Sequence, residues 1–180
     1  IQDVRANNNE ALLECCHVNV RLLKFLLAWR DPVEESGKNV SAGRLTLSDL
    51  RTRNNRLLRK AARTSDFEML QILKNWRALP SDQSSCARLT ADDLRAKNNA
   101  ALTEAAQWNR LDVCQFLKDW RFDTKENNSP DDAALGLTRE DARIVFSRLS
   151  ARYSHGSSHS SLSLNTCKFF QQWLSDYYNP

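Results

Sequence analysis

The chain has 180 residues, which is enough for one domain of ordinary size or for a short array of repeats. Hydrophobic residues make up 41% of it and charged residues 27%, close to the averages of globular proteins, so the composition excludes wholesale disorder. Only four glycines occur, and no two of them have the spacing of a G-x-G-x-x-G, P-loop or G-x-S-x-G motif. This excludes the common nucleotide sites and the nucleophile turn of the hydrolases.

The five cysteines cannot all pair with one another, and Cys16, Cys114 and Cys167 lie within apolar helical patterns. Buried free thiols behave as small hydrophobic side chains, so this usage indicates a reducing compartment. No apolar run approaches the ~20 residues of a membrane span, and no signal peptide is recognisable. We therefore expect a cytoplasmic protein with no cofactor and no membrane partner.

Four segments of the chain begin alike and share one pattern of apolar residues. Each starts with Asp-x-Arg, and the starting residues are Asp3, Asp49, Asp93 and Asp141, at intervals of 46, 44 and 48 residues. The first three segments continue into an Asn-Asn pair. Self-similarity at a fixed period is typical of a repeat architecture. We place the repeats at about residues 3–30, 49–77, 93–121 and 141–175 of a single domain, 1–180.

The first copy predicts two helices of about ten residues joined by a polar turn at residues 17–19. The first helix carries the pair Ala11-Leu12. The apolar face of the second comprises Leu22, Phe25, Leu26 and Trp29. The spacing i, i+3, i+4, i+7 is that of an amphipathic helix. Asparagines before the first helix suit an N-cap, where the side-chain oxygen accepts a backbone N–H bond.

The second, third and fourth copies repeat this pattern, each with a tryptophan at the end of the second helix. In the fourth copy polar Ser150 and Thr166 replace apolar residues, as expected of a repeat that closes an array. Stacked repeats bury their apolar faces against their neighbours. The predicted core therefore includes Leu12, Leu58, Leu102, Trp29, Trp76 and Trp120.

Polar connections separate the copies, and each of them ends in Leu-Thr-x-x-Asp, with the threonines at Thr46, Thr90 and Thr138. Thr-x-x-Asp resembles a capping box in which aspartate replaces the usual glutamate, so it predicts a short extra helical turn. The rest of each connection should be an exposed loop. We expect the recurring arginines to bridge to an acid or a carbonyl of an adjacent repeat; they are Arg5, Arg51, Arg95 and Arg143.

The third copy reads Ala101-Leu102-x-x-Ala105-Ala106 and then Leu111-x-Val113-x-x-Phe116-Leu117, which resembles an ankyrin repeat. The likeness covers about 28 residues in each of three copies and the fourth more weakly. Asn-Asn stands where the family has Thr-Pro, and the period is stretched to about 45 from about 33. HEAT repeats, whose period is near 45, are the alternative.

The Asp-x-Arg-x-Asn-Asn repeats are also similar to those in ankyrin proteins of large DNA viruses, including iridoviruses. The resemblance implies an all-α fold, a solenoid of four helix-turn-helix ankyrin-like repeats with long inter-repeat loops. It also implies that the concave face, formed by the first helix of each pair and the turns beside it, binds protein partners.

Charge and aromatic residues single out part of that face. From Arg44 to Arg77 there are nine Lys and Arg against three Asp and Glu, whereas the whole chain carries a net charge of +4. Trp108 lies in a polar turn, where an exposed aromatic ring is a candidate interface anchor. The predicted partner-binding residues are Glu14, His17, Arg53, Arg56, Lys60, Arg63, Thr64, Glu104, Gln107 and Trp108.

No constellation of side chains points to catalysis. His17 has no serine or acid arranged around it as a triad, and His155 and His159 lie in a serine-rich stretch, typical of a loop rather than a zinc site. We expect a non-enzymatic protein-binding module without a metal.

The viral resemblance implies an effector that binds a host signalling protein in the host cytoplasm and modulates innate-immune or inflammatory signalling. The partner would carry an acidic patch. The alternatives are a cellular scaffold or adaptor, and weak nucleic-acid binding through the basic second repeat. Nucleic acid is the weaker candidate because the basic charge is confined to one repeat, with no aromatic residue interleaved for base stacking. The oligomeric state stays open.

Overall fold

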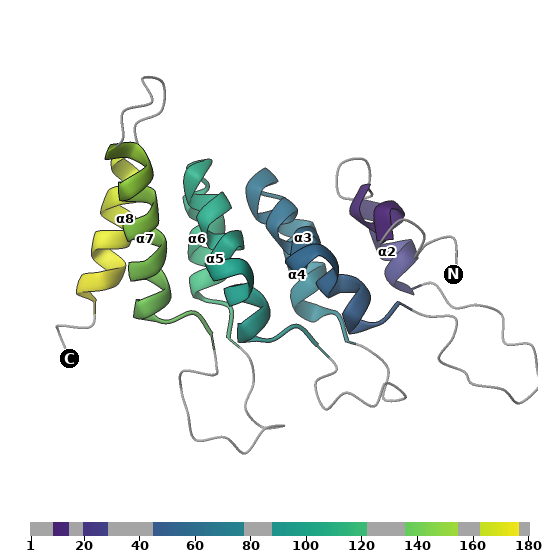
Figure 1. The fold of residues 1–180 in the computed structure, drawn as a ribbon. Coiled ribbons are helices and arrows are strands. Elements are labelled where there is room, and N and C mark those ends of the chain that lie inside the picture. The colour runs from purple at the N-terminus through teal and green to yellow at the C-terminus, as the bar shows by residue number, and fades with distance from the viewer. Residues whose placement is uncertain are drawn as a thin grey trace, which may run out of the picture. The chain divides into compact units, whose positions relative to one another are not determined.

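The computed structural model describes residues 9–14, 20–28, 45–77, 88–121, 136–154 and 163–176 (Figure 1). Residues 9–14 are helical, and the labelled helices are α2 (Val20–Ala28), α3 (Leu47–Thr64), α4 (Phe67–Asn75), α5 (Ala91–Gln107), α6 (Leu111–Lys118), α7 (Arg139–Ser154) and α8 (Leu164–Ser175). Within these ranges no residue belongs to a strand, which confirms the predicted all-α class. None of these helices combines the length and apolar character needed to cross a membrane.

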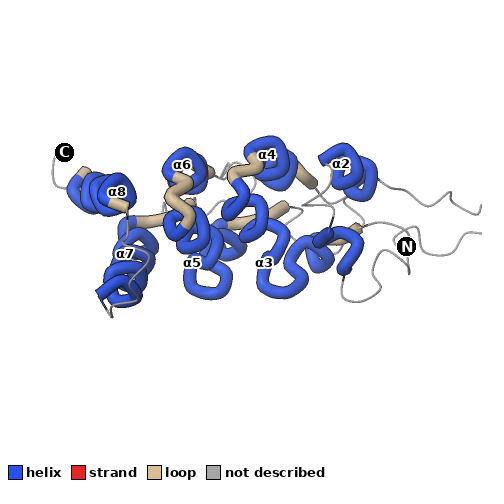
Figure 2. Tube along the Cα trace, turned by 90° about the horizontal axis from the view of Figure 1, so that it is seen from above, coloured by secondary structure: helices blue, strands red, loops and turns tan. Residues whose placement is uncertain are grey.

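The chain divides into two compact units. The first comprises Ile1–Ala61 and Asp66–Leu89, and the second comprises Ala62–Ser65 and Thr90–Pro180. In the second unit α5 packs against α6 and α7, and α8 packs against α6 and α7, so that α5 and α7 form one layer and α6 and α8 the other (Figure 2). In the first unit α2 packs against α4. We refer to residues 9–14 with α2, α3 with α4, α5 with α6, and α7 with α8 as the first to fourth helix pairs.

The core follows the predicted apolar stripes. Leu12, Leu58, Leu102 and Trp120 are buried, as predicted, whereas Trp76 is only half-buried. Trp29 lies outside the described residues. The prediction that Leu22 and Phe25 belong to the buried face of their helix is wrong, because both are exposed. Leu26 of the same predicted face is buried, and α2 also buries Leu23. Thr166 is fully buried and its hydroxyl donates a hydrogen bond to Asn109 Oδ1 at 3.1 Å, which explains how a polar residue occupies that core position.

Capping boxes begin the first helices of the second, third and fourth pairs, as predicted, and in α3 and α5 a left-handed segment separates the capped turn from the rest of the helix. The backbone N–H of the threonine donates to the aspartate carboxylate at 2.7 Å in Thr46–Asp49, and at 2.8 Å in Thr90–Asp93 and in the fourth pair. In each case the threonine hydroxyl lies within hydrogen-bonding distance of the same carboxylate oxygen. The aspartates are buried, and these bonds provide the hydrogen-bond donors that a buried carboxylate requires.

The Asn-Asn motif forms a left-handed turn within α3 and α5. Arg53 and Asn54 have φ of 54° and 56°, and Lys97 and Asn98 have φ of 54° and 57°, and each run continues into a further asparagine with positive φ. Left-handed backbone costs a residue with a Cβ roughly 1–2 kcal/mol, and asparagine adopts it more readily than most residues. The motif therefore changes the backbone from right-handed to left-handed between the capped turn and the rest of the helix.

The last asparagine of the first and third motifs reaches the capping aspartate of the following pair. Asn9 Nδ2 donates to Asp49 Oδ1 at 3.2 Å in the first unit, and Asn99 Nδ2 donates to Asp141 Oδ1 at 3.0 Å in the second. The expected N-cap role of these asparagines is not what the structure shows, because Asn9 Oδ1 and Asn99 Oδ1 are buried and accept no hydrogen bond from any described residue. They act as donors between pairs instead.

An arginine reinforces this link in the second unit. Arg95 donates from Nε to Asp141 Oδ2 at 3.1 Å and from Nη2 to Gly136 O at 2.6 Å, which confirms for Arg95 the predicted bridge to an adjacent repeat. Burial raises the pKa of Asp141, but hydrogen bonds from Thr138, Asn99 and Arg95 outweigh burial and leave that pKa below its ordinary value. Arg143, the equivalent of Arg95 in the fourth pair, binds Glu140 of its own helix.

Substitution by glycine and by valine should rank in opposite order of stability at two exposed lysines, Lys97 in the left-handed turn and Lys168 in an ordinary helix. At Lys97, valine should lower the free energy of unfolding by at least about 1 kcal/mol, because β-branched residues strongly disfavour positive φ. Glycine should leave it unchanged or raise it by up to about 1 kcal/mol. At Lys168, in ordinary helix α8, glycine should be the more destabilising of the two. Urea unfolding followed by circular dichroism measures both; the same ranking at the two positions would contradict the left-handed turn.

Candidate functional site

Trp108 stands at the end of α5, where the chain turns towards α6. The turn contains Asn109 with φ of 53°, and Arg110 N donates to Ala105 O at 2.8 Å, which is the bond pattern of a Schellman helix ending. The α5 stripe that precedes it, including Ala105 and Ala106, is buried, but Trp108 lies beyond that stripe and is 54% exposed. The position of the helix end therefore places a large aromatic side chain at the surface.

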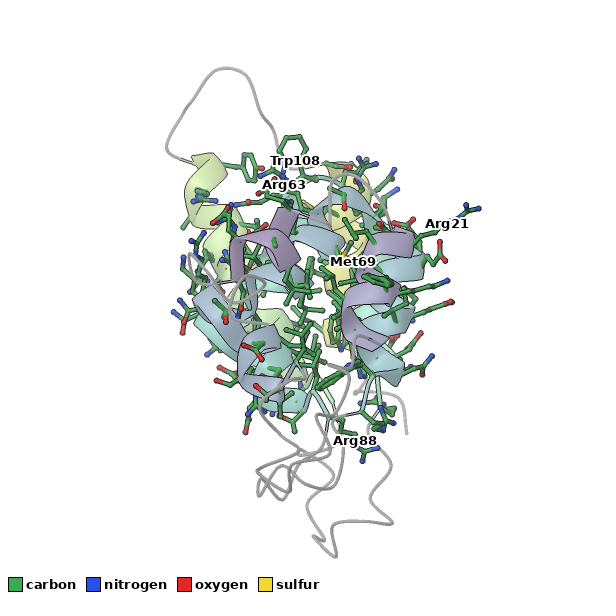
Figure 3. The ribbon with its side chains drawn as sticks, turned by 90° about the vertical axis from the view of Figure 1, so that its right-hand side faces the viewer. Arg21, Arg63, Met69, Arg88 and Trp108 are labelled. Carbon is green, nitrogen blue, oxygen red and sulfur yellow. The ribbon has the colours of Figure 1, made fainter. Side chains whose placement is uncertain are left out.

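Arg63 lies against this tryptophan (Figure 3). Its guanidinium carbon is 5.1 Å from the centroid of the Trp108 ring, within the range of a cation–π contact, and Arg63 is itself exposed. Such a contact contributes about 0.5–1 kcal/mol at an exposed site, enough to orient the pair. Thr64 is exposed, and Glu104 and Gln107 are partly exposed. The second unit thus contains five of the predicted partner-binding residues.

Among the described residues the first unit contains four others, and three of them form ion pairs. Arg53 Nη2 is 2.8 Å from the carboxylate of Glu10, and Lys60 Nζ is 3.7 Å from that of Glu14. Lys60 Nζ also donates to Leu13 O at 2.8 Å, and only 10% of the lysine side chain is exposed. Lys60 therefore connects α3 to the helical residues 9–14 and offers little of itself to a partner.

An arginine of the basic segment also stabilises the left-handed turn of α3. Arg59 donates from Nε to Asn54 O at 3.2 Å and from Nη2 to Arg53 O at 3.3 Å. Arg56 is partly exposed. The density of basic residues in this segment thus has a structural use in addition to its charge, which the sequence pattern alone did not distinguish.

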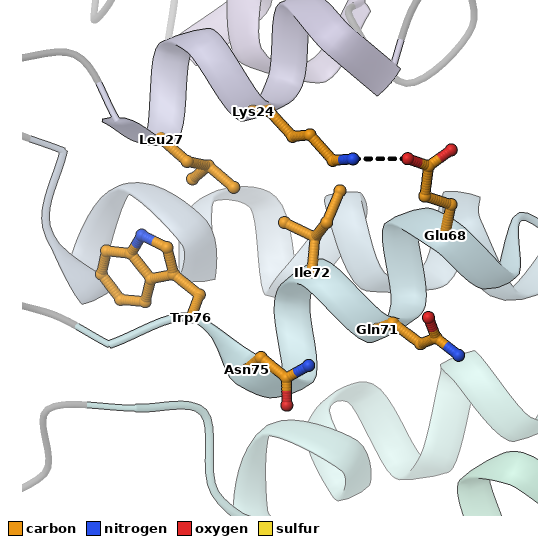
Figure 4. Close-up of a pocket in the computed structure, with 7 residues that line it drawn as sticks. All are labelled: Lys24, Leu27, Glu68, Gln71, Ile72, Asn75 and Trp76. Atoms are coloured by element: carbon orange, nitrogen blue, oxygen red, sulfur yellow. Dashed lines mark hydrogen bonds and ion pairs between the residues drawn. The ribbon is translucent and has the colours of Figure 1, made fainter.

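The structure brings together Arg63 with Trp108, and Lys60 with Glu14. His17, His155 and His159 lie outside the described residues. Sequence reasoning missed a groove between α2 and α4 in the first unit, of about 510 Å³ (Figure 4). It is lined by Lys24, Leu27, Glu68, Gln71, Ile72, Asn75 and Trp76. Lys24 Nζ and Glu68 Oε1 are 2.6 Å apart across it. The signal that could have revealed it is the opposite charge of Lys24 and Glu68.

Two observations on the described side chains concern metal binding and nucleophilic chemistry. Among the described residues no group of three His, Cys, Asp or Glu is arranged to hold a metal ion. Burial raises the pKa of Cys114 to about 12, with Asp112 adding to the effect, so this thiol is protonated at neutral pH and is a poor nucleophile. The exposed pair of Arg63 and Trp108 is the feature best suited to contact another molecule.

Comparison of the chain with protein-family models, with curated protein sequences and with solved structures finds no match in any of the three.

The contacts of Lys60 predict a loss of stability when its ammonium is removed. Lys60→Met keeps the apolar stem but leaves Leu13 O and Glu14 without their cation, and should lower the free energy of unfolding by about 1.5–3 kcal/mol. Arg56→Met, a matched change on the same helix, should alter it by less than about 0.5 kcal/mol. Urea denaturation measures both, and equal effects of the two changes would show that the Lys60 contacts do not stabilise the fold.

Proposed function

We propose that this chain is a non-enzymatic module that binds another protein, with Trp108 and Arg63 as its anchor. The observation that carries the proposal is the exposed Trp108 ring with the Arg63 guanidinium against it. Tryptophan and arginine are the residue types most often found where a few side chains provide most of the binding energy. The ring supplies apolar contact area and the guanidinium supplies a charge that a carboxylate can bind in a bidentate manner.

The proposed partner has an acidic segment with an apolar side chain beside it. Arg63 lies in the basic segment of the second pair, so a carboxylate approaching Arg63 meets a favourable field. Arg53, Arg59 and Lys60 bind acceptors within the chain, which lowers the number of cations available to a phosphate backbone. This supports an acidic protein over nucleic acid as the partner.

We further propose that the four helix pairs are ankyrin-like repeats of a solenoid. The sequence likeness, the all-helical pairs and the threonine caps at related positions support this. The similarity to ankyrin proteins of large DNA viruses points to a host signalling protein as the partner, in innate-immune or inflammatory signalling. That last step rests on analogy between folds.

The proposal predicts a binding loss that two single substitutions share. The immobilised chain is exposed to a nuclease-treated eukaryotic cell lysate, retained proteins are quantified by mass spectrometry, and the affinity of each purified candidate is then measured by titration. Trp108→Ala should weaken binding at least about 30-fold, because an anchor of this kind contributes 2 kcal/mol or more. Arg63→Glu should weaken the binding of an acidic partner by more than Trp108→Ala does.

Arg152→Glu is the charge-matched control, since Arg152 is an exposed arginine of the second unit on α7. It should retain the partner, and circular dichroism should show equal helicity for all variants. A partner that binds Trp108→Ala and Arg63→Glu as tightly as it binds the unmodified chain would refute the anchor. Capture that disappears with nuclease would favour nucleic-acid binding.

A further inference from the structure

The α2 surface that carries Leu22 and Phe25 is more exposed than the equivalent surfaces of α4, α6 and α8. Leu22 is 43% exposed and Phe25 is 55% exposed. Leu22 stands seven residues before the tryptophan of its repeat, and the residues at the same position of the other repeats are fully buried. Those residues are Met69, Val113 and Thr166, each 0% exposed. Large apolar side chains clustered on an exposed face mark an interaction site more often than scattered ones do.

The short helix of the first pair shows the same difference. Ala11 is exposed, whereas its equivalents Leu57 and Ala101 are 1% and 2% exposed. Both helices of the first pair therefore expose, at matching positions, residues that the second and third pairs bury.

In the first unit, α2 covers the equivalent surface of α4. Ile72 and Glu68 stand four and eight residues before Trp76, and both line the groove that α2 forms with α4 (Figure 4). The side chains of α2 that face them are Lys24 and Leu27. In α2, Phe25 and Arg21 stand four and eight residues before Trp29. By this register, α2 presents Arg21 and Phe25 as α4 presents Glu68 and Ile72, towards a helix on the preceding side.

Contacts in the second unit have the same direction. Thr166, the equivalent of Leu22, binds Asn109 in the turn of the preceding pair. Lys118, the equivalent of Leu27, faces α8, where its ammonium is 5.4 Å from the centroid of the Trp173 ring and 3.3 Å from Asp176 Oδ2. Two independent pairs of helices therefore agree on which positions face the preceding helix and which face the following one.

The charge at the equivalent of the Lys24–Glu68 ion pair is reversed on α2. The α2 residue at the position of Glu68 is Arg21, an exposed side chain that extends away from the ribbon in Figure 3. A helix that covers α2 as α2 covers α4 would bring its equivalent of Lys24 to Arg21. To be complementary to Arg21, the residue of the covering helix at that position must be a glutamate or an aspartate. An aliphatic residue follows it three positions later, as Leu27 follows Lys24 in α2.

We propose that the α2 surface formed by Leu22, Phe25 and Arg21 binds an amphipathic helix of a partner protein, which presents a glutamate or aspartate to Arg21 and an aliphatic side chain to Phe25. This contact continues the α2–α4 interface by one further helix. It is separate from the anchor at Trp108, which lies in the second unit, and it stands whether or not that anchor binds a protein.

The test uses two synthetic helical peptides as probes for the intact chain. Both have the α2 sequence Val20–Ala28 and a hydrocarbon staple on the face away from Lys24 and Leu27. One, the lysine peptide, keeps Lys24, and the other, the glutamate peptide, has Lys24→Glu. Fluorescence anisotropy measures their affinity for the chain. The glutamate peptide should bind saturably and several-fold more tightly than the lysine peptide, which Arg21 repels.

Three protein variants decide the outcome. The double variant Leu22→Ser/Phe25→Ser should bind the glutamate peptide at least tenfold more weakly, whereas Leu164→Ser, which removes an exposed leucine of α8, should bind it normally. Arg21→Glu should reverse the preference between the two peptides. Circular dichroism should show unchanged helicity, because all these side chains are exposed. Absence of saturable binding, normal binding by the double variant, or an unchanged preference in Arg21→Glu would each overturn the proposal.

Discussion

The rest of the structure depends on a buried aspartate that accepts two kinds of hydrogen bond. Its carboxylate closes the first turn of its own helix through a threonine, and it accepts a hydrogen bond from an asparagine of the preceding pair. A buried carboxylate is stable only when such donors surround it. The local capping bond and the contact about 40 residues away therefore depend on one ionised group, in Asp49 of the first unit and in Asp141 of the second.

The left-handed turn explains how the asparagine reaches that carboxylate. Positive φ at Lys97, Asn98 and Asn99 interrupts α5, and the side chain of Asn99 then points to Asp141. The strain of the turn is offset by the bonds it permits, and the helix resumes afterwards with its apolar stripe buried. Arg63 and Trp108 stand at the opposite ends of α3 and α5 from these capped turns, and both are exposed.

Sequence periodicity was sufficient for the helices, for the buried leucines and for the capping boxes, because each depends on residues within a few positions of one another. The roles of Asn9 and Asn99 could not be read in this way. Asparagine before a helix usually caps it, and the competing use depends on an aspartate in the next repeat. The exposure of Leu22 was equally hidden, since its spacing before the tryptophan matches that of Met69, although Leu22 is 43% exposed and Met69 is fully buried. For the candidate site, the pattern indicated a basic face but could not divide it into Lys60, which binds Leu13 O, and Arg63, which lies against Trp108.

The most direct test of the central claim is a double-mutant cycle between Asn99 and Asp141, with Asn99→Ala, Asp141→Asn and the two combined, followed by urea unfolding. At pH 7 the cycle should give a coupling energy of about 1 kcal/mol or more, since the bond joins a buried amide to a carboxylate. The pKa of Asp141 lies below its ordinary value of about 3.9 in the folded chain, so its contribution is complete above that pH. The coupling should be lost as the pH falls through the folded-state pKa. A coupling energy near zero at pH 7, or one that does not change down to pH 2, would contradict the account.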